Sequence, residues 1–225
     1  MPLIAPSIVA ADWARLGEAL EVAESAGASM VHLDVMDGHF VPEISIGLPV
    51  LASLRKATQL AIEVHLLIEC PERYANDFIA AGADRVSFHV EATRHGRHLV
   101  EQIRSCGAQA GLAVSPSTPL AAIAEFWTEI DFLTVLTAEP GLRAGELVPS
   151  SVAKVRAAAQ SRADRRLNFA LEAEGGIGPE NFDELTQAGA DILVVGSAIF
   201  NSVNPRARLE ECVRRAARIH GSMRV

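Results

Sequence analysis

Short runs of apolar, largely β-branched residues recur along the chain at fairly even intervals. Each is followed by a stretch with helical periodicity that ends near a Gly or Pro. The eight runs lie at residues 3–9, 30–35, 62–68, 85–90, 110–114, 132–136, 168–173 and 192–195. Helices are expected between them, for example over 12–26 and 71–81, and a last helix over 205–219. This alternation of strand and helix predicts a parallel sheet covered by helices.

Eight strand–helix units in 225 residues predict an α/β fold, a single (β/α)8 TIM barrel, with one domain over residues 1–225. The competing fold is a doubly wound open sheet, which usually has about five or six strands and a glycine-rich turn after the first strand. Here the first strand ends in Ala5-Pro6-Ser7, and no linker or low-complexity segment divides the chain. The barrel is therefore the fold that we expect.

Polar side chains gather where the predicted strands end, which in a barrel is the rim that carries the active site. His32 and Asp34 share one face of the second strand, because side chains alternate along a strand. The apolar residues around them indicate that this face is the barrel interior. We interpret His89 and Glu91 as hydrogen-bonding residues of the rim. The other polar residues at predicted strand ends are Ser7, His65, Ser115, Thr137, Glu139 and Glu174.

Two histidines and two carboxylates from three strands, His32, Asp34, His65 and Glu174, suit a divalent metal such as zinc, iron, manganese or cobalt. The alternative is a hydrogen-bonded core network in which carboxylates satisfy the histidines and no ion binds. The two carboxylates also suit proton transfer. Two acids that face each other across a substrate can remove a proton α to a carbonyl on one face and replace it on the other.

Glycines stand where many barrels bind phosphate, after the seventh and eighth strands. Gly175-Gly176 follows the seventh strand and Gly196-Ser197 follows the eighth. Glycine also serves turns for steric reasons alone, but two such elements at matching strand ends favour a phosphate site. The segment 137–149 is long for a connection between a strand and a helix and is a candidate lid.

Composition narrows the function classes. A net charge of −8 gives no basic surface for nucleic acid or an anionic membrane. Three widely spaced cysteines, the lack of a targeting segment and the lack of a membrane span favour a reducing, cytoplasmic location. The only two lysines, Lys56 and Lys154, are expected in helices away from strand ends, which argues against a lysine-dependent aldolase or decarboxylase.

Four segments carry a resemblance to a known family: APSI at 5–8, VHLDVMDGHFVP at 31–42, EVHL at 63–66 and VGSAIF at 195–200. On these motifs the chain resembles the ribulose-phosphate 3-epimerases, from about residue 3 to residue 200. The resemblance implies a TIM barrel that holds one divalent metal ion and interconverts ribulose 5-phosphate and xylulose 5-phosphate in the pentose phosphate pathway. It also implies a small sugar phosphate as the partner and a homo-oligomeric assembly.

The resemblance assigns expected roles residue by residue. His32, Asp34 and His65 match metal ligands, and Asp34 also matches one acid/base residue. Glu174 stands where the family has the aspartate of an Asp-Gly-Gly motif, so we expect it to be the second acid/base residue and the fourth ligand. The expected substrate-binding residues are Ser7, Met36, His65, Gly141, Arg143, Gly175, Gly176, Gly196 and Ser197.

Other departures from the family pattern lie around the same site. The lid reads PGLRAG at 140–145 where the family has PGFGGQ, and Arg143 can supply a charge-assisted contact to phosphate in its place. Leu67 and Leu136 replace methionines, and Ser115 replaces an asparagine. These changes leave two alternatives open: another ketose phosphate as the substrate, or a non-catalytic relative that binds a sugar phosphate or a metal.

Overall fold

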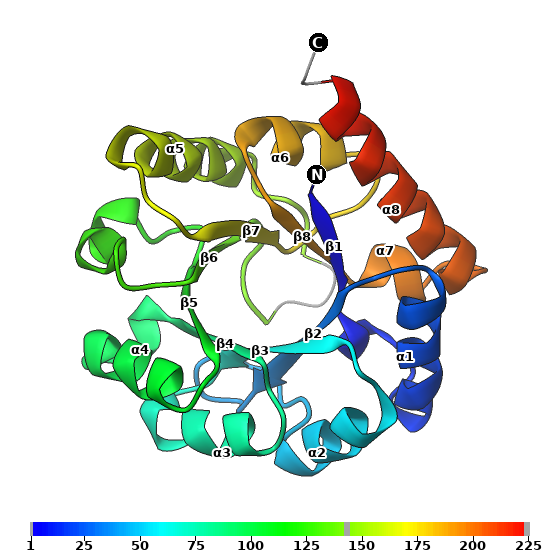
Figure 1. The fold of residues 1–225 in the computed structure, drawn as a ribbon, viewed down its shortest axis with the longest axis horizontal. Helices are drawn as coiled ribbons and strands as arrows, with labels where there is room; N and C mark the ends of the chain where they lie inside the picture. Colours follow the sequence, from blue (N-terminus) through cyan, green and yellow to red (C-terminus); the bar gives the residue numbers. More distant parts are fainter. Residues whose placement is uncertain (1, 142–144, 223–225) are drawn as a thin grey trace.

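The computed structural model describes residues 2–141 and 145–222. Its eight strands form one parallel sheet in the order β1-β8-β7-β6-β5-β4-β3-β2. A parallel bridge between Ser7 and His32 joins the two ends of the sheet and closes it. Figure 1 looks into this barrel and shows the helices arranged around its outside. The predicted TIM barrel is confirmed.

The strands are β1 Leu3–Pro6, β2 Met30–Met36, β3 Ala61–Leu67, β4 Arg85–His89, β5 Gln109–Val114, β6 Phe132–Leu136, β7 Ala170–Glu174 and β8 Ile192–Val195. The α-helices are α1 Leu16–Ser25, α2 Leu48–Ala57, α3 Ala75–Ala80, α4 Gly96–Ser105, α5 Pro149–Arg165, α6 Phe182–Ala188, α7 Ser197–Phe200 and α8 Pro205–Ser222. Short 3₁₀ helices are η1 Ile8–Ala10, η2 Trp13–Arg15, η3 Pro71–Arg73, η4 Val90–Ala92 and η5 Leu120–Phe126. Across the described residues, no helix has the length and apolar character needed to cross a membrane.

Six of the eight strands have bounds that differ from the sequence prediction by at least one residue, and β1 and β7 differ most. β1 ends at Pro6 rather than at residue 9, because the chain turns there into η1. The backbone N–H of Ser7 still donates to the Val195 carbonyl, so Ser7 remains at the rim of the barrel. β7 begins two residues later than predicted and includes Glu174. Between β5 and β6 the connection is η5 instead of an α-helix.

The alternation of side chains along each strand divides the core into two zones. In β3, Ile62, Val64 and Leu66 are fully buried in the apolar layer between strands and helices. Glu63 and His65 alternate with them and are also fully buried, but they meet polar groups of neighbouring strands inside the barrel. Buried polar groups need partners to offset their loss of hydration. The interior of this barrel is therefore where chemistry is concentrated.

Candidate active site and metal centre

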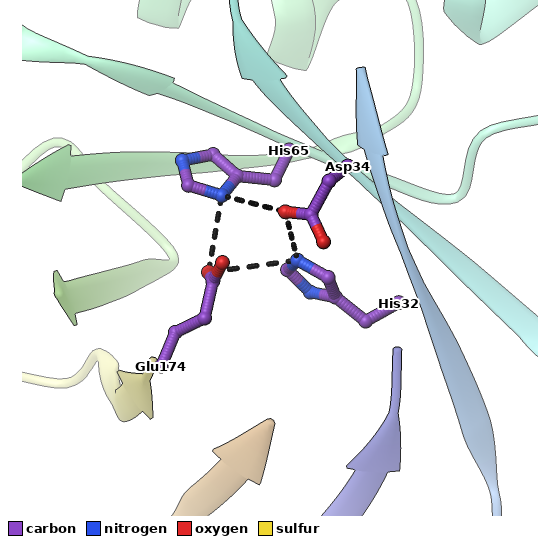
Figure 2. Close-up of side chains that lie close together, drawn as sticks. All are labelled: His32, Asp34, His65 and Glu174. Atoms are coloured by element: carbon purple, nitrogen blue, oxygen red, sulfur yellow. Dashed lines mark hydrogen bonds and ion pairs between the residues drawn. The ribbon is translucent and has the colours of Figure 1, made fainter. Parts of the chain in front are cut away.

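Four of the predicted site residues converge at the carboxyl ends of β2, β3 and β7. Figure 2 shows the side chains of His32, Asp34, His65 and Glu174 pointing toward one another. His32 Nε2 lies 3.1 Å from Asp34 Oδ1 and 3.5 Å from Glu174 Oε2. His65 Nδ1 lies 3.4 Å and 3.0 Å from the same two oxygens. These two nitrogens and two oxygens thus form a closed ring of possible metal-ligand atoms inside the barrel.

The spacing of these donors fits a single divalent ion. Ligands about 2.0–2.1 Å from a tetrahedral ion lie about 3.3 Å from one another, and the four distances range from 3.0 to 3.5 Å. Two of the ligand atoms, His65 Nδ1 and Glu174 Oε2, are buried and form an ion pair at 3.0 Å, but neither makes a hydrogen bond of good geometry among the described residues. A purely hydrogen-bonded network would align such buried atoms for hydrogen bonds. The donor set therefore fits a metal better than it fits a structural network.

The charges of the cluster fit a dication as well. Burial lowers the pKa of both histidines, but the carboxylates of Glu174 and Asp34 outweigh it. The pKa of His65 is raised to about 10 and that of His32 lies well above its ordinary value. Burial raises the pKa of Asp34, but the facing histidines lower it well below its usual range. Both shifts favour the protonated, positively charged histidines beside the carboxylates, and a divalent cation at this position would supply positive charge in their place.

Ser7 orients Asp34. Its hydroxyl donates to Asp34 Oδ2 over 2.9 Å, while Oδ1 faces the two histidines. The contact depends on barrel closure, because the bridge between Ser7 and His32 brings the end of β1 beside β2. Asp34 Oδ1 is therefore directed to His32 and His65, and Oδ2 accepts a hydrogen bond from Ser7.

An open cavity of about 1290 Å³ lies above the cluster at the same rim. Asp34 and Glu174 reach into its floor, with exposed fractions of 8% each. Seven of the predicted substrate-binding residues line it: Ser7, Met36, Gly141, Gly175, Gly176, Gly196 and Ser197. His65 is fully buried below the cavity, and Arg143 lies outside the described residues. The cavity can therefore hold a small molecule directly over the two carboxylates.

The loop after β7 has a backbone that requires glycine. Gly175 and Gly176 have φ of +106° and +63°, and a Cβ on Gly176 would lie 2.6 Å from Leu147 N. The Asn181 side chain holds the same loop, because it donates to the Gly176 carbonyl at 2.8 Å and accepts from Gly178 N at 3.1 Å. Sequence reasoning missed Asn181, since an Asn directly before a helix is typical of an ordinary cap or turn.

Replacing Gly176 with Ala is expected to weaken binding of a phosphorylated ligand. The left-handed conformation costs a residue with a side chain about 1–2 kcal/mol, and the new Cβ meets backbone atoms that cannot move aside cheaply. If the loop shifts to relieve this, KM should rise about tenfold or more, the equivalent of about 1.4 kcal/mol. Steady-state kinetics with ribulose 5-phosphate measures it.

Gly17→Ala is the matched control, because Gly17 lies on the exposed face of α1 and its added Cβ meets nothing within 4 Å. Its KM should equal that of the unchanged protein. Equal KM values for all three proteins would show that the loop after β7 does not bind the phosphate.

The rim residues after β4 and β5 form a separate network. His89 Nδ1 lies 3.0 Å from Glu91 Oε2, as the rim interpretation predicted, and the His89 ring stacks on His65 with centroids 5.1 Å apart. Burial lowers the pKa of His89 to about 4, so its ring is neutral at pH 7. Glu91 Oε1 accepts from the backbone N–H of Ser115 at 2.9 Å. This network supports His65 from behind.

Both lysines lie in helices as predicted, Lys56 in α2 and Lys154 in α5, but the Lys154 ammonium is not away from the strand ends. This residue belongs to α5, but its long side chain carries the ammonium to the loop after β5, where it donates to the carbonyls of Ser115 and Pro116 at 2.8 and 2.7 Å. The ammonium is held by backbone carbonyls, and Lys154 does not line the cavity. The geometry of the Lys154 side chain therefore argues against lysine chemistry in this cavity.

A second polar layer, which sequence reasoning missed, lies one step deeper in the barrel. Glu63 and Glu172 are fully buried there, and Arg85 Nε donates to Glu63 Oε2 at 2.5 Å. Burial raises the pKa of Glu63, but His32 and Arg85 outweigh it and hold that pKa at about 2. Burial and the neighbouring Glu63 raise the pKa of Glu172 well above its usual range. The period-2 pattern was the available signal, because Glu63 and Glu172 precede His65 and Glu174 by two residues.

Comparisons with known proteins identify the family of the chain. The ribulose-phosphate 3 epimerase family matches residues 3–200. The chain is 41% identical to ribulose-phosphate 3-epimerase of Mycobacterium bovis over 99% of this chain and 97% of that protein. It is also 41% identical to the enzyme of that name from Treponema pallidum, over 88% of this chain and 91% of that protein.

Solved structures support the fold independently. Orotidine 5'-phosphate decarboxylase from Pyrococcus horikoshii superimposes with a TM-score of 0.68 over 96% of this chain and 99% of that one. At 20% identity this likeness shows the barrel fold alone. The identities over almost the whole chain and the family match reach further: the chain belongs to the ribulose-phosphate 3-epimerase family and is an isomerase.

Proposed function

We propose that this chain is a metal-dependent 3-epimerase that interconverts ribulose 5-phosphate and xylulose 5-phosphate. The observation that carries the proposal is the convergence of two carboxylates from opposite sides of the barrel, Asp34 on β2 and Glu174 on β7, at the floor of one cavity. Relatives named for this activity support the substrate. The glycine loop after β7 and the Gly196-Ser197 pair at the start of α7 support a phosphate at the far end of the cavity.

Epimerisation needs a proton to leave C3 on one face of the sugar and another to arrive on the opposite face. Asp34 and Glu174 perform these two transfers through an enediolate, and each takes the other's role in the reverse reaction. A bound divalent metal supplies Lewis-acid stabilisation of the negative charge that develops on the substrate oxygen. His32, His65, Asp34 and Glu174 are the residues that would hold it.

The chain contributes orientation as well as proton transfer. The Ser7 hydroxyl on Asp34 Oδ2 fixes the carboxylate plane, so the acid keeps one position relative to the substrate. Gly141 brings the segment after β6 against Val41 of the loop after β2, because a Cβ at this position would lie 2.5 Å from Val41 Cβ. This contact lets the two loops close one side of the cavity and limit the access of water.

The proposal is tested first by removing and restoring the metal. Treatment with a chelator should abolish the conversion of ribulose 5-phosphate, and Zn²⁺, Mn²⁺, Co²⁺ or Fe²⁺ should restore it. Because His32 and His65 both have raised pKa values, binding of each ion at pH 7 should release roughly two protons. Isothermal titration in two buffers of different ionisation enthalpy measures that number.

A conversion rate unaffected by a chelator that strips all metal would contradict the metal dependence. If metal binds but ribulose 5-phosphate is not converted, another ketose phosphate becomes the better substrate, as the altered lid allows. Assembly into a homo-oligomer and a cytoplasmic location stay predictions, which size-exclusion chromatography with light scattering and cell fractionation can check.

A further inference from the structure

His32 is held by a carboxylate on each side of its ring. Its Nε2 faces the metal cluster, 3.1 Å from Asp34 Oδ1. Its Nδ1 faces the deeper layer, 3.2 Å from Glu63 Oε1. Both His32 and Glu63 have no exposed surface, so water cannot replace either contact. The only described partner of Nδ1 is therefore the Glu63 carboxylate.

Arg85 fixes the orientation of Glu63. Its Nε donates to Glu63 Oε2 at 2.5 Å, and its guanidinium is packed over the Phe132 ring at 4.0 Å from the centroid. With Oε2 turned to Arg85, Oε1 must face His32. The three residues form a chain that runs from β4 through β3 to β2 and ends at the metal cluster.

We infer that Glu63, held by Arg85, is a positioning residue that fixes the tautomer of His32 for metal binding. A carboxylate held in this way can only accept a hydrogen bond. The proton of a neutral His32 must therefore sit on Nδ1, which leaves the Nε2 lone pair free for the ion. This inference rests on the metal dependence in the proposed function and adds a residue that does not itself touch substrate or ion.

Arg85 determines which end of a Gln side chain at position 63 would face His32. In a Glu63→Gln variant, Arg85 would still require an oxygen in front of its Nε, so the amide NH₂ would face His32 Nδ1. An NH₂ group donates, which places the histidine proton on Nε2 and blocks the metal position. Glu63→Asp lacks a methylene but remains an acceptor only, so it preserves the tautomer.

The test compares three variants by their affinity for Zn²⁺ in competition with a chromophoric chelator. Loss of a group that orients a metal ligand typically costs about 10- to 100-fold in affinity, and we expect a loss of this size for Glu63→Gln. Glu63→Asp should stay within about tenfold of the unchanged protein. Ser151→Ala is the matched control, because Ser151 on α5 is equally buried, but its hydroxyl has no hydrogen-bond partner among the described residues.

The order of the two Glu63 variants decides the question. If Glu63 only fills space, Gln should bind metal better than Asp, because Gln has the shape of Glu, and this order would overturn the inference. Circular dichroism checks that each variant folds. If Glu63→Gln does not fold, Glu63→Asn takes its place, and an Asn affinity equal to that of Asp would likewise overturn it.

The Zn²⁺ titration also tests the metal dependence separately from the role of Glu63. An unchanged protein that binds no divalent ion would overturn the metal dependence and this inference together. If Glu63→Gln binds Zn²⁺ as tightly as the unchanged protein, the inference about Glu63 is wrong, but the proposed function is not affected.

Discussion

Replacing Asp34 with Asn is expected to lower the rate of ribulose 5-phosphate conversion by about 10³- to 10⁴-fold. General acid/base transfer contributes about 10²–10⁴-fold, and Asp34 is also one of the four expected ligands of the ion. The amide has nearly the same shape but cannot take a proton from C3. A coupled assay that detects xylulose 5-phosphate measures the loss.

Ser7→Ala is the milder companion to this variant. It removes the hydroxyl that donates to Asp34 Oδ2 but leaves the carboxylate in place, so the rate should fall much less than with Asp34→Asn. Asp34→Asn should also bind metal less tightly, which chelator competition shows. An Asn variant with more than a tenth of the original rate would remove Asp34 from the proton-transfer mechanism.

Replacing Glu174 with Gln is expected to lower the rate of ribulose 5-phosphate conversion by about 10²- to 10⁴-fold, because the second proton transfer then lacks its acid. Glu174→Asp is the more informative change. The longer side chain brings Oε2 to 3.0 Å from His65 Nδ1, and Asp would withdraw the carboxylate by a bond length or more. A misplacement of about 1 Å can cost about a hundredfold, so we expect a loss of that order in kcat.

The three proteins are compared at saturating metal, so that a loss of affinity for the ion does not add to the loss of rate. A Glu174→Asp variant that is faster than the unchanged protein would mean that the barrel accommodates Asp better than Glu. The spacing around Glu174 would then not be the active arrangement.

The barrel could be predicted from the sequence because its signal is repeated. Each of the eight strands carries a short apolar run, and an error in one run does not change the count. The ends of the strands were harder to predict where local turns interrupt the apolar pattern. β1 stops at Pro6 because the chain turns into η1, which an apolar pattern through Ile8 and Val9 does not reveal.

The cluster of candidate metal ligands could be predicted because His32, Asp34, His65 and Glu174 lie toward the carboxyl ends of their strands and face the barrel interior. The deeper layer of Glu63, Glu172 and Arg85 could not be predicted, because the role of its residues depends on contacts between different strands. Glu63 is two residues from His65 in the sequence, but its partner is His32 of the neighbouring strand. The position of the Lys154 ammonium was missed for a similar reason, since the reach of its side chain from α5 to the loop after β5 is a tertiary feature.

Epimerisation at C3 is tested by exchange of the C3 proton of ribulose 5-phosphate in deuterated water, followed by NMR, with the metal-loaded protein. The account predicts incorporation of deuterium at C3 together with formation of xylulose 5-phosphate, and loss of both in Asp34→Asn. A metal-loaded protein that produces neither deuterium incorporation nor xylulose 5-phosphate would contradict the proposal that Asp34 and Glu174 carry out epimerisation at this site.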